Sequence, residues 1–112
     1  MPLEFSHDAI VVTVPLVTLS EAKEHLRIRD TLHDADVTAK TATAQAAILA
    51  NLANAADATW TDLTVPLPVK HAILLLTTHY YEHRGDAMPD VDAALWEAIA
   101  RLLAWYRDPT LA

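Results

Sequence analysis

The stretch VKHAILLLTTHYYEHRGD, residues 69–86, indicates the fold class of this chain. The run AILLL in its first half makes a helix over this stretch apolar nearly all round. A helix without a polar face belongs at the centre of a fold, because no side of it is suited to water. Pro68 fits the start of such a helix and Gly85 fits a left-handed cap after it, which predicts a helix over 68–83.

Composition extends this helical interpretation to the whole chain. The 112 residues include one glycine and no cysteine, and alanine is abundant in helix-period contexts. A single glycine excludes Gly-rich phosphate loops, and the lack of cysteine excludes disulfides and Cys-ligated metals. We therefore expect an all-α fold, a small bundle of about four helices in one domain over residues 1–112, with one long helix and an extended N-terminal arm.

Charge and hydropathy exclude several classes of function. The formal net charge is −7, which argues against wrapping around phosphate backbones, since that affinity comes from Lys and Arg. No apolar run approaches the roughly 18–20 residues needed to cross a bilayer, so we expect no membrane partner. Glu4 and Asp8 stand where a signal peptide would carry Lys or Arg, so export is not indicated.

The N-terminal arm, residues 1–17, ends in the β-branched run AIVVTVPLV. Residues 9–17 are therefore expected to be extended or to form an edge strand, paired either within the subunit or with a neighbouring subunit. The sequence Thr18-Leu19-Ser20-Glu21 then matches a capping box, which predicts a helix from Leu19 to about Ile28. The apolar face of that helix should be buried and consists of Leu19, Ala22 and Leu26.

A longer helix is expected to start at Asp34 or Asp36 and to continue to about Ala58. Roughly 22 residues at about 1.5 Å each give a rod of about 33 Å. Its apolar positions keep helical spacing and are Thr41, Ala44, Ile48, Leu52 and Ala55. The Pro-containing connection that follows, residues 59–68, could include a short strand at Trp60 to Val65.

The last helix is predicted from about Val91 to Tyr106, with a C-terminal tail over 108–112. Its apolar stripe consists of Leu95, Ile99, Leu102, Leu103 and Tyr106. Trp105 lies off that stripe, and Trp and Arg are common anchors of binding surfaces. We therefore expect partner contacts at Trp105, Tyr106 and Arg107, and in the arm at Val11, Val12 and Val14. For Trp105, the alternative is that it covers the end of the core.

The run His79-Tyr80-Tyr81-Glu82-His83 fits the H-x-x-E-H pattern of one class of zinc peptidases. Two histidines four residues apart on a helix can share a metal ion, with Glu82 as general base. No second motif supplies a third ligand, so a structural interpretation is favoured. In it, Tyr80 packs in the core, while His79, Glu82 and His83 line the solvated edge of the last turn. We expect no bound zinc, no cofactor and no catalytic residue.

The segment Thr18 to Ile28, TLSEAKEHLRI, resembles the opening T-L-x-E-A-K-x-H-L-R-I of the tailed-phage head–tail connector family. Residues 67–84 are similar to that family's apolar helix, which ends in a His-aromatic-Tyr-Glu-x-Arg run, so the zinc-like pattern is a by-product of it. The closing segment 102–107, LLAWYR, resembles the family's L-L-x-P-Y-R end, with Trp105 in place of the usual proline. The resemblance covers about residues 18–107.

The resemblance implies a small α-helical adaptor subunit of a phage or prophage-derived particle, without catalytic activity. Such subunits assemble as a ring, usually twelve-fold, beneath the portal protein. There they extend the DNA channel and dock the stopper or tail-completion protein. Double-stranded DNA would pass through without specific binding, and an acidic channel wall suits that passage. The protein would be made in the cytoplasm of the bacterial host and would reside in the virion.

Two other classes of function remain as alternatives. One is a small acidic helical module that binds or regulates a partner, and the other is a zinc hydrolase that uses His79 and His83. A ring-sized mass in solution or with portal would separate the adaptor from both.

Overall fold

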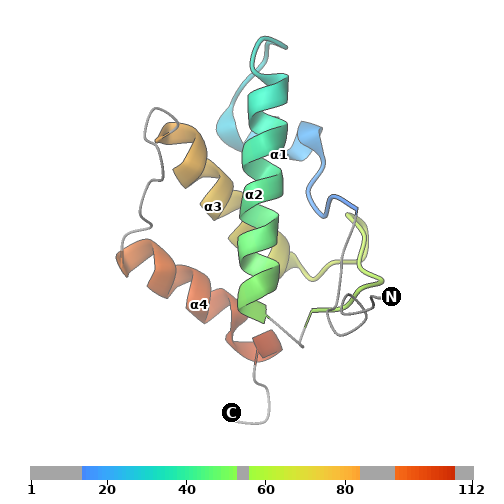
Figure 1. The fold of residues 1–112 in the computed structure, drawn as a ribbon, viewed down its shortest axis with the longest axis vertical. Coiled ribbons are helices and arrows are strands. Elements are labelled where there is room, and N and C mark those ends of the chain that lie inside the picture. The colour runs from blue at the N-terminus through green and yellow to red at the C-terminus, as the bar shows by residue number, and fades with distance from the viewer. Residues whose placement is uncertain (1–13, 53–55, 84–92, 108–112) are drawn as a thin grey trace, which may run out of the picture.

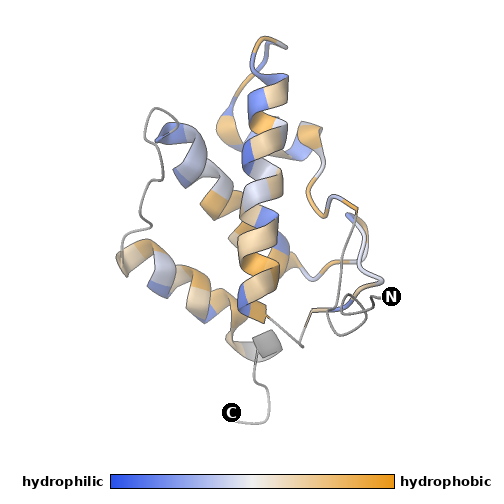
Figure 2. Cartoon of the chain, viewed as in Figure 1, coloured by the Kyte–Doolittle hydropathy of each residue, from blue (hydrophilic) through white to orange (hydrophobic). Residues whose placement is uncertain are grey.

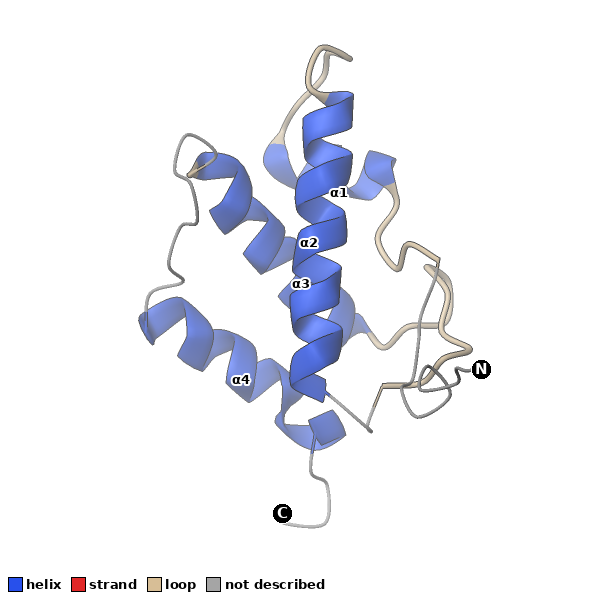
Figure 3. Ribbon diagram, in the orientation of Figure 1, coloured by secondary structure: helices blue, strands red, loops and turns tan. Residues whose placement is uncertain are grey.

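The computed structural model describes residues 14–52, 56–83 and 93–107, of which 105–107 are described by their backbone alone. These residues form four helices, α1 (Leu19–Leu26), α2 (Asp34–Leu52), α3 (Leu67–Glu82) and α4 (Ala93–Arg107). Within the described ranges no residue belongs to a strand (Figure 3). The predicted all-α class is confirmed.

Helices α2 and α3 form the centre of the bundle, because each packs against all three of the other described helices. Figure 1 shows α2 along the long axis of the molecule, with α3 crossing behind it and α4 beside its lower half. The segments on its other side are residues 14–17, which we call the arm base, and the 56–66 connection. The predicted central position of α3 is confirmed.

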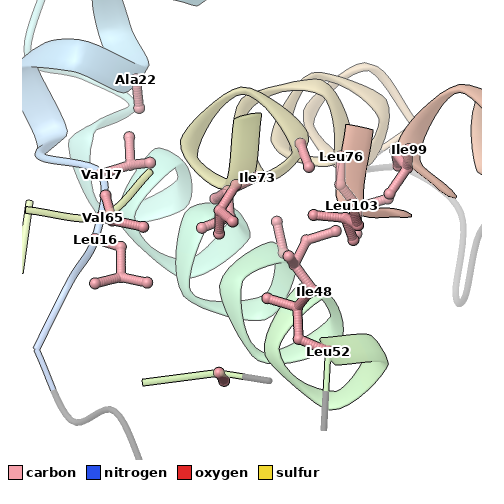
Figure 4. Packing of buried hydrophobic residues seen from close by; sticks show 14 of the residues in the cluster. Leu16, Val17, Ala22, Ile48, Leu52, Val65, Ile73, Leu76, Ile99 and Leu103 are labelled. Atoms are coloured by element: carbon pink, nitrogen blue, oxygen red, sulfur yellow. The ribbon is translucent and has the colours of Figure 1, made fainter. Parts of the chain in front are cut away.

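The core is formed where α2, α3 and α4 meet and where the arm base closes the opposite end (Figure 4). From the three helices it includes Ile48, Leu52, Ile73, Leu76, Ile99 and Leu103, each at most 2% exposed. The arm base contributes Leu16 and Val17 to the core, and these side chains are 0% and 2% exposed. The arm is therefore anchored at its base, since burial of two aliphatic side chains contributes roughly 1.5–3 kcal/mol each.

Helix α1 begins with the predicted capping box. The Thr18 hydroxyl accepts a hydrogen bond from the Glu21 amide at 3.0 Å, and the Glu21 carboxylate accepts one from the Thr18 amide at 2.9 Å. Two backbone donors that a helix start leaves without partners are thereby satisfied.

The end of α1 and its buried face differ from the prediction. Arg27 has φ 63° and ψ 39°, in the left-handed region, so the helix ends at Leu26 rather than at Ile28. The Ile28 amide donates to the Lys23 carbonyl at 2.9 Å, the pattern of a Schellman cap. Ala22 is buried and Leu26 is partly buried, but Leu19 is 37% exposed, so the prediction for Leu19 was wrong.

Replacing Thr18 by Ala should lower the free energy of unfolding by about 0.5–2 kcal/mol, because the Glu21 amide loses its acceptor. We expect α1 to fray before the rest of the domain, with early loss of hydrogen-exchange protection between Leu19 and Leu26. Ser20→Ala, an exposed serine in the same turn, is the matched control. A loss of protection spread evenly over all helices would contradict this local effect.

The other helices follow the predicted pattern with shifted ends. The structure ends α2 at Leu52, and Ala56 to Ala58 are not helical, so the prediction of a helix to Ala58 was too long. The predicted core positions of α2 are confirmed at Thr41, Ala44, Ile48 and Leu52. Ala55, the Gly85 cap and the predicted helix start at Val91 lie outside the described residues.

The predicted strand at Trp60 to Val65 is wrong, because the segment forms a turn. The Thr61 carbonyl accepts hydrogen bonds from the amides of Thr64 and Val65, at 3.2 and 2.9 Å. The Thr64 hydroxyl in turn accepts from the Thr61 amide at 2.9 Å. These local bonds use the backbone groups that pairing with a strand would require.

Candidate interaction surface

The backbone of the arm base is hydrogen-bonded to α2 through the side-chain amide of Gln45. The Leu16 amide donates to Gln45 Oε1 at 2.7 Å, and Gln45 Nε2 donates to the Val14 carbonyl at 2.9 Å. Gln45 is 8% exposed, the bond to the Leu16 amide is buried, and the bond to the Val14 carbonyl is partly buried. For residues 14–17 the expected edge strand is wrong, because a side chain supplies the partners that a second strand would provide.

A second connection joins three segments that are distant in the sequence. Lys70 Nζ of α3 lies 2.7 Å from the Glu21 carboxylate of α1 and 2.7 Å from the Asp62 carbonyl of the turn. The Lys70 side chain is 13% exposed, while that of Glu21 is 40% exposed. The capping box of α1 is thereby fixed to the start of α3.

These contacts lower the pKa of Glu21 in the folded state. Burial opposes ionisation of this carboxyl, but the hydrogen bonds from Lys70 and from the Thr18 amide outweigh it, and the Lys70 charge adds to them. A carboxyl with a depressed folded pKa contributes stability above its unfolded pKa, about 4.3 for Glu. That contribution disappears as the pH falls through the folded pKa.

Replacing Lys70 by Met keeps most of the aliphatic stem and removes the ammonium group. At neutral pH we expect the free energy of unfolding to fall by about 1 kcal/mol, since Glu21 is partly exposed and solvent screens the pair. The difference between wild type and variant should shrink as the pH falls from about 5 to about 3, because Glu21 becomes protonated. Urea unfolding at a series of pH values measures both quantities.

Lys40→Met is the matched control for this pair. Lys40 Nζ lies 2.9 Å from Asp36 Oδ1, but the two residues are one turn apart on α2. Its loss should therefore change stability by no more than about 0.5 kcal/mol. If the Lys70 effect were the same at every pH, the lysine would act through its hydrogen bond to the Asp62 carbonyl rather than through Glu21.

A groove of about 690 Å³ lies between the arm base and α2. Apolar side chains form most of its wall and include Val14, Pro15, Leu19, Ala42, Ala46 and Leu49. Polar residues also line this mostly apolar wall, among them Thr38 and Asp62, and the polar groups of Thr41 and Gln45 are used within the subunit. Thr41 Oγ1 donates to the Val37 carbonyl at 2.8 Å, and the Gln45 amide binds the arm base. The groove therefore offers an apolar surface.

The outer face of α2 beyond Lys40 has no charged residue, although the whole chain is acidic. Its exposed positions after Lys40 are small, namely Ala42, Thr43, Ala46 and Ala50. Pale and orange colours accordingly occupy much of α2 in Figure 2. Helix faces with small side chains permit close approach of another protein segment.

The zinc-like motif has a geometry that differs from its predicted surroundings. His79 is 9% exposed, so the prediction that it lines a solvated edge was wrong, while Glu82 and His83 are exposed as expected. Tyr80 is partly buried against the core. The two imidazole rings lie 4.5 Å apart, and His83 Nδ1 is 2.8 Å from the His79 carbonyl. A carbonyl only accepts, so Nδ1 carries a proton there.

Across residues 14–52, 56–83 and 93–107, no three His, Cys, Asp or Glu side chains are placed to hold a metal ion. The absence of zinc stays a prediction, which metal analysis of the purified protein tests. Among the same residues, no helix has the length and hydropathy of a membrane span.

The structure describes some of the residues that were predicted to contact a partner. Val14 is 43% exposed and lines the groove. Val11 and Val12 lie outside the described residues, and the backbone of Trp105, Tyr106 and Arg107 forms the end of α4. The arm and the end of α4 are therefore not brought together by any described contact.

Sequence reasoning missed Gln45 and Lys70. Gln45 is an uncharged polar residue between Ala44 and Ala46, at a position that the helical period assigns to the core side of α2. A buried amide needs partners, so this position indicated a polar contact without naming its partner. Nothing in the sequence singled out Lys70 from other lysines.

Comparison with known proteins gives one match. The model of the family described as phage gp6-like head-tail connector protein matches residues 16–93, which include α1, α2 and α3. No curated protein and no solved structure matches the chain.

Proposed function

We propose a structural function for this chain, because it belongs to the phage gp6-like head–tail connector family, whose model matches residues 16–93. That match is the observation that carries the proposal. The chain acts as an adaptor subunit of the virion. Copies assemble as a ring, twelve-fold as is usual for such adaptors, beneath the portal protein. The ring extends the DNA channel and docks the stopper or tail-completion protein, with no cofactor and no catalysis.

The surface of the subunit supports lateral assembly. The outer face of α2 beyond Lys40 is uncharged and small, and the groove beside it is apolar. A formal charge of −7 supports a channel wall that double-stranded DNA passes without binding, because negative walls repel phosphates. The subunit is made in the cytoplasm of the bacterial host before it joins the particle.

The predicted partner contacts acquire roles in this assembly. Val11, Val12 and Val14 of the arm contact a neighbouring subunit. Trp105, Tyr106 and Arg107 at the end of α4 contact the portal or a neighbouring subunit. Of these residues, Val14 is 43% exposed and lines the groove.

A second candidate function, an acidic regulatory module, would use the groove to bind a partner as a monomer. The uncharged α2 face is also compatible with it, so the mass of the assembled protein decides between the two. The zinc hydrolase has less support, since no third ligand stands beside His79 and His83 among the described residues.

The decisive experiment mixes the purified full chain with portal-bearing heads and with isolated portal. We expect a ring of uniform mass on the portal, measured by mass photometry and seen by electron microscopy. Bovine serum albumin at equal concentration controls for non-specific binding. A chain that stays monomeric and does not bind portal would overturn the adaptor function.

A further inference from the structure

The occupant of the α2 groove can be inferred from the arm itself. The groove lies beside Val14, the first residue that the structure describes, and Val14 and Pro15 form part of its wall. The two hydrogen bonds of Gln45 fix the arm base at this edge. The chain before Val14 therefore starts from a fixed point beside an apolar groove.

The sequence before Val14 matches the chemistry of such a groove. Ile10, Val11 and Val12 are consecutive apolar, β-branched residues, and Asp8 ends this run on its N-terminal side. The groove wall presents alanine, valine and leucine side chains, its Thr41 and Gln45 groups already have partners, and Thr38 and Asp62 are further polar residues of the wall. Apolar side chains can therefore pack on the alanine, valine and leucine part of the wall without leaving Thr41 or Gln45 unsatisfied.

The same sequence argues against a return of the arm into the groove of its own subunit. Residues 10–13 contain no glycine, proline, asparagine or aspartate, so this part of the arm lacks the residues that most favour a tight reversal. Pro15 also restricts Val14 to extended conformations. Four extended residues span about 13 Å, which is long enough to reach a neighbouring copy packed beside the arm base.

We propose that Ile10 to Val12 of one copy occupy the α2 groove of the neighbouring copy. This inference rests on the proposed ring assembly. Each subunit then gives one arm and receives one, a head-to-tail contact that closes when the ring closes. The volume of about 690 Å³ lies in the range of roughly 300–1,000 Å³ found for sites that enclose small ligands.

The lack of native cysteine permits a direct test. One set of copies carries Val12→Cys and another carries Ala46→Cys, which lies in the groove wall and is exposed. The two sets are mixed, assembled on portal and treated with a short bis-maleimide cross-linker. We expect a linked pair of chains in the mixture that is absent from either set alone. Ala100→Cys, at an exposed alanine of α4, replaces Ala46→Cys in the control and should give no linked pair.

A second pair of variants tests the groove without cross-linking. Ala46→Arg places a charged side chain in the groove and should abolish or strongly reduce ring formation, while the far-UV circular dichroism stays that of wild type. Ala100→Arg should assemble as wild type does. Ring formation at the wild-type level by Ala46→Arg would overturn the inference.

The outcomes separate this inference from the adaptor function. A ring that forms on portal without linked chains overturns the groove contact and leaves the adaptor function standing. A chain that carries both cysteines and links only within itself shows that the groove holds its own arm, which also overturns the inference. Failure of every variant and of wild type to assemble overturns the adaptor function, and the inference with it.

Discussion

Replacing Gln45 by Leu should lower the free energy of unfolding by about 2–4 kcal/mol. The substitution leaves the buried Leu16 amide and the partly buried Val14 carbonyl without their partner, and an unsatisfied buried group costs about 1–3 kcal/mol. Leu16 is fully buried, so water reaches its amide only if the arm base leaves α2. We therefore expect release of residues 14–17 before the helices unfold.

A series of variants separates the two bonds of Gln45. Gln45→Glu keeps an acceptor for the Leu16 amide, but at neutral pH it buries a carboxylate against the Val14 carbonyl, so it should destabilise at least as much as Gln45→Leu. Its stability relative to wild type should recover as the pH falls, because the protonated carboxyl can donate to that carbonyl. Thr43→Ala, at an exposed position of α2, should change stability by less than about 0.5 kcal/mol. Urea unfolding gives the stabilities, and hydrogen exchange at Leu16 reports on the arm base. Equal stabilities for wild type, Gln45→Glu and Gln45→Leu would show that the arm base is anchored by the burial of Leu16 and Val17 alone.

Truncation after Ala104 should remove attachment to portal-bearing heads and leave the domain folded. Leu103, at 0% exposed, is the last buried residue that the structure describes in α4, so the truncated chain keeps the described core. The eight residues removed include Trp105 and Arg107, side-chain types that often dominate binding energy. Loss of such anchors costs about 2 kcal/mol or more each, which is roughly 30-fold or more in affinity.

Two measurements decide how the truncation acts. Thermal unfolding should show a cooperative transition close to that of the full chain, and binding to portal-bearing heads should fall below detection. The full chain with Trp105→Ala tests the tryptophan alone and should show an intermediate loss of binding. A truncated protein that unfolds would assign Trp105 to the core instead.

Features that depend on neighbouring residues in the sequence were predictable. The capping box at Thr18 and Glu21 has the predicted bonds, because its four residues contain every group involved. The central helix was predicted from its apolar run. His79 lies three residues after Leu76 and therefore on the same, buried side of the helix. The prediction that His79 lines a solvated edge was wrong because it assumed that the last turn of a helix faces water.

Contacts between distant segments were not predictable from the sequence. Gln45 binds an amide 29 residues away, and Lys70 binds a carboxylate 49 residues away. Helical periodicity assigns each of these residues to a face, but the packing of the helices decides which groups meet there. The strand prediction for Trp60 to Val65 was wrong for a related reason. Threonine favours strands in general, but the Thr64 hydroxyl here closes a local turn.

The bond between Glu21 and Lys70 can form only after Lys70 has been synthesised, so during synthesis α1 waits for its partner. Helix α1 has eight residues, too few for a stable isolated helix in water. It leaves the ribosome 49 residues before Lys70, and synthesis at about 5–20 residues per second makes that interval roughly 2–10 seconds. During that interval the nascent arm and α1 have neither Lys70 nor the α3 core to pack against. The chain before Leu67, which includes α2 as well as α1, is therefore exposed to chaperones and proteases until α3 emerges.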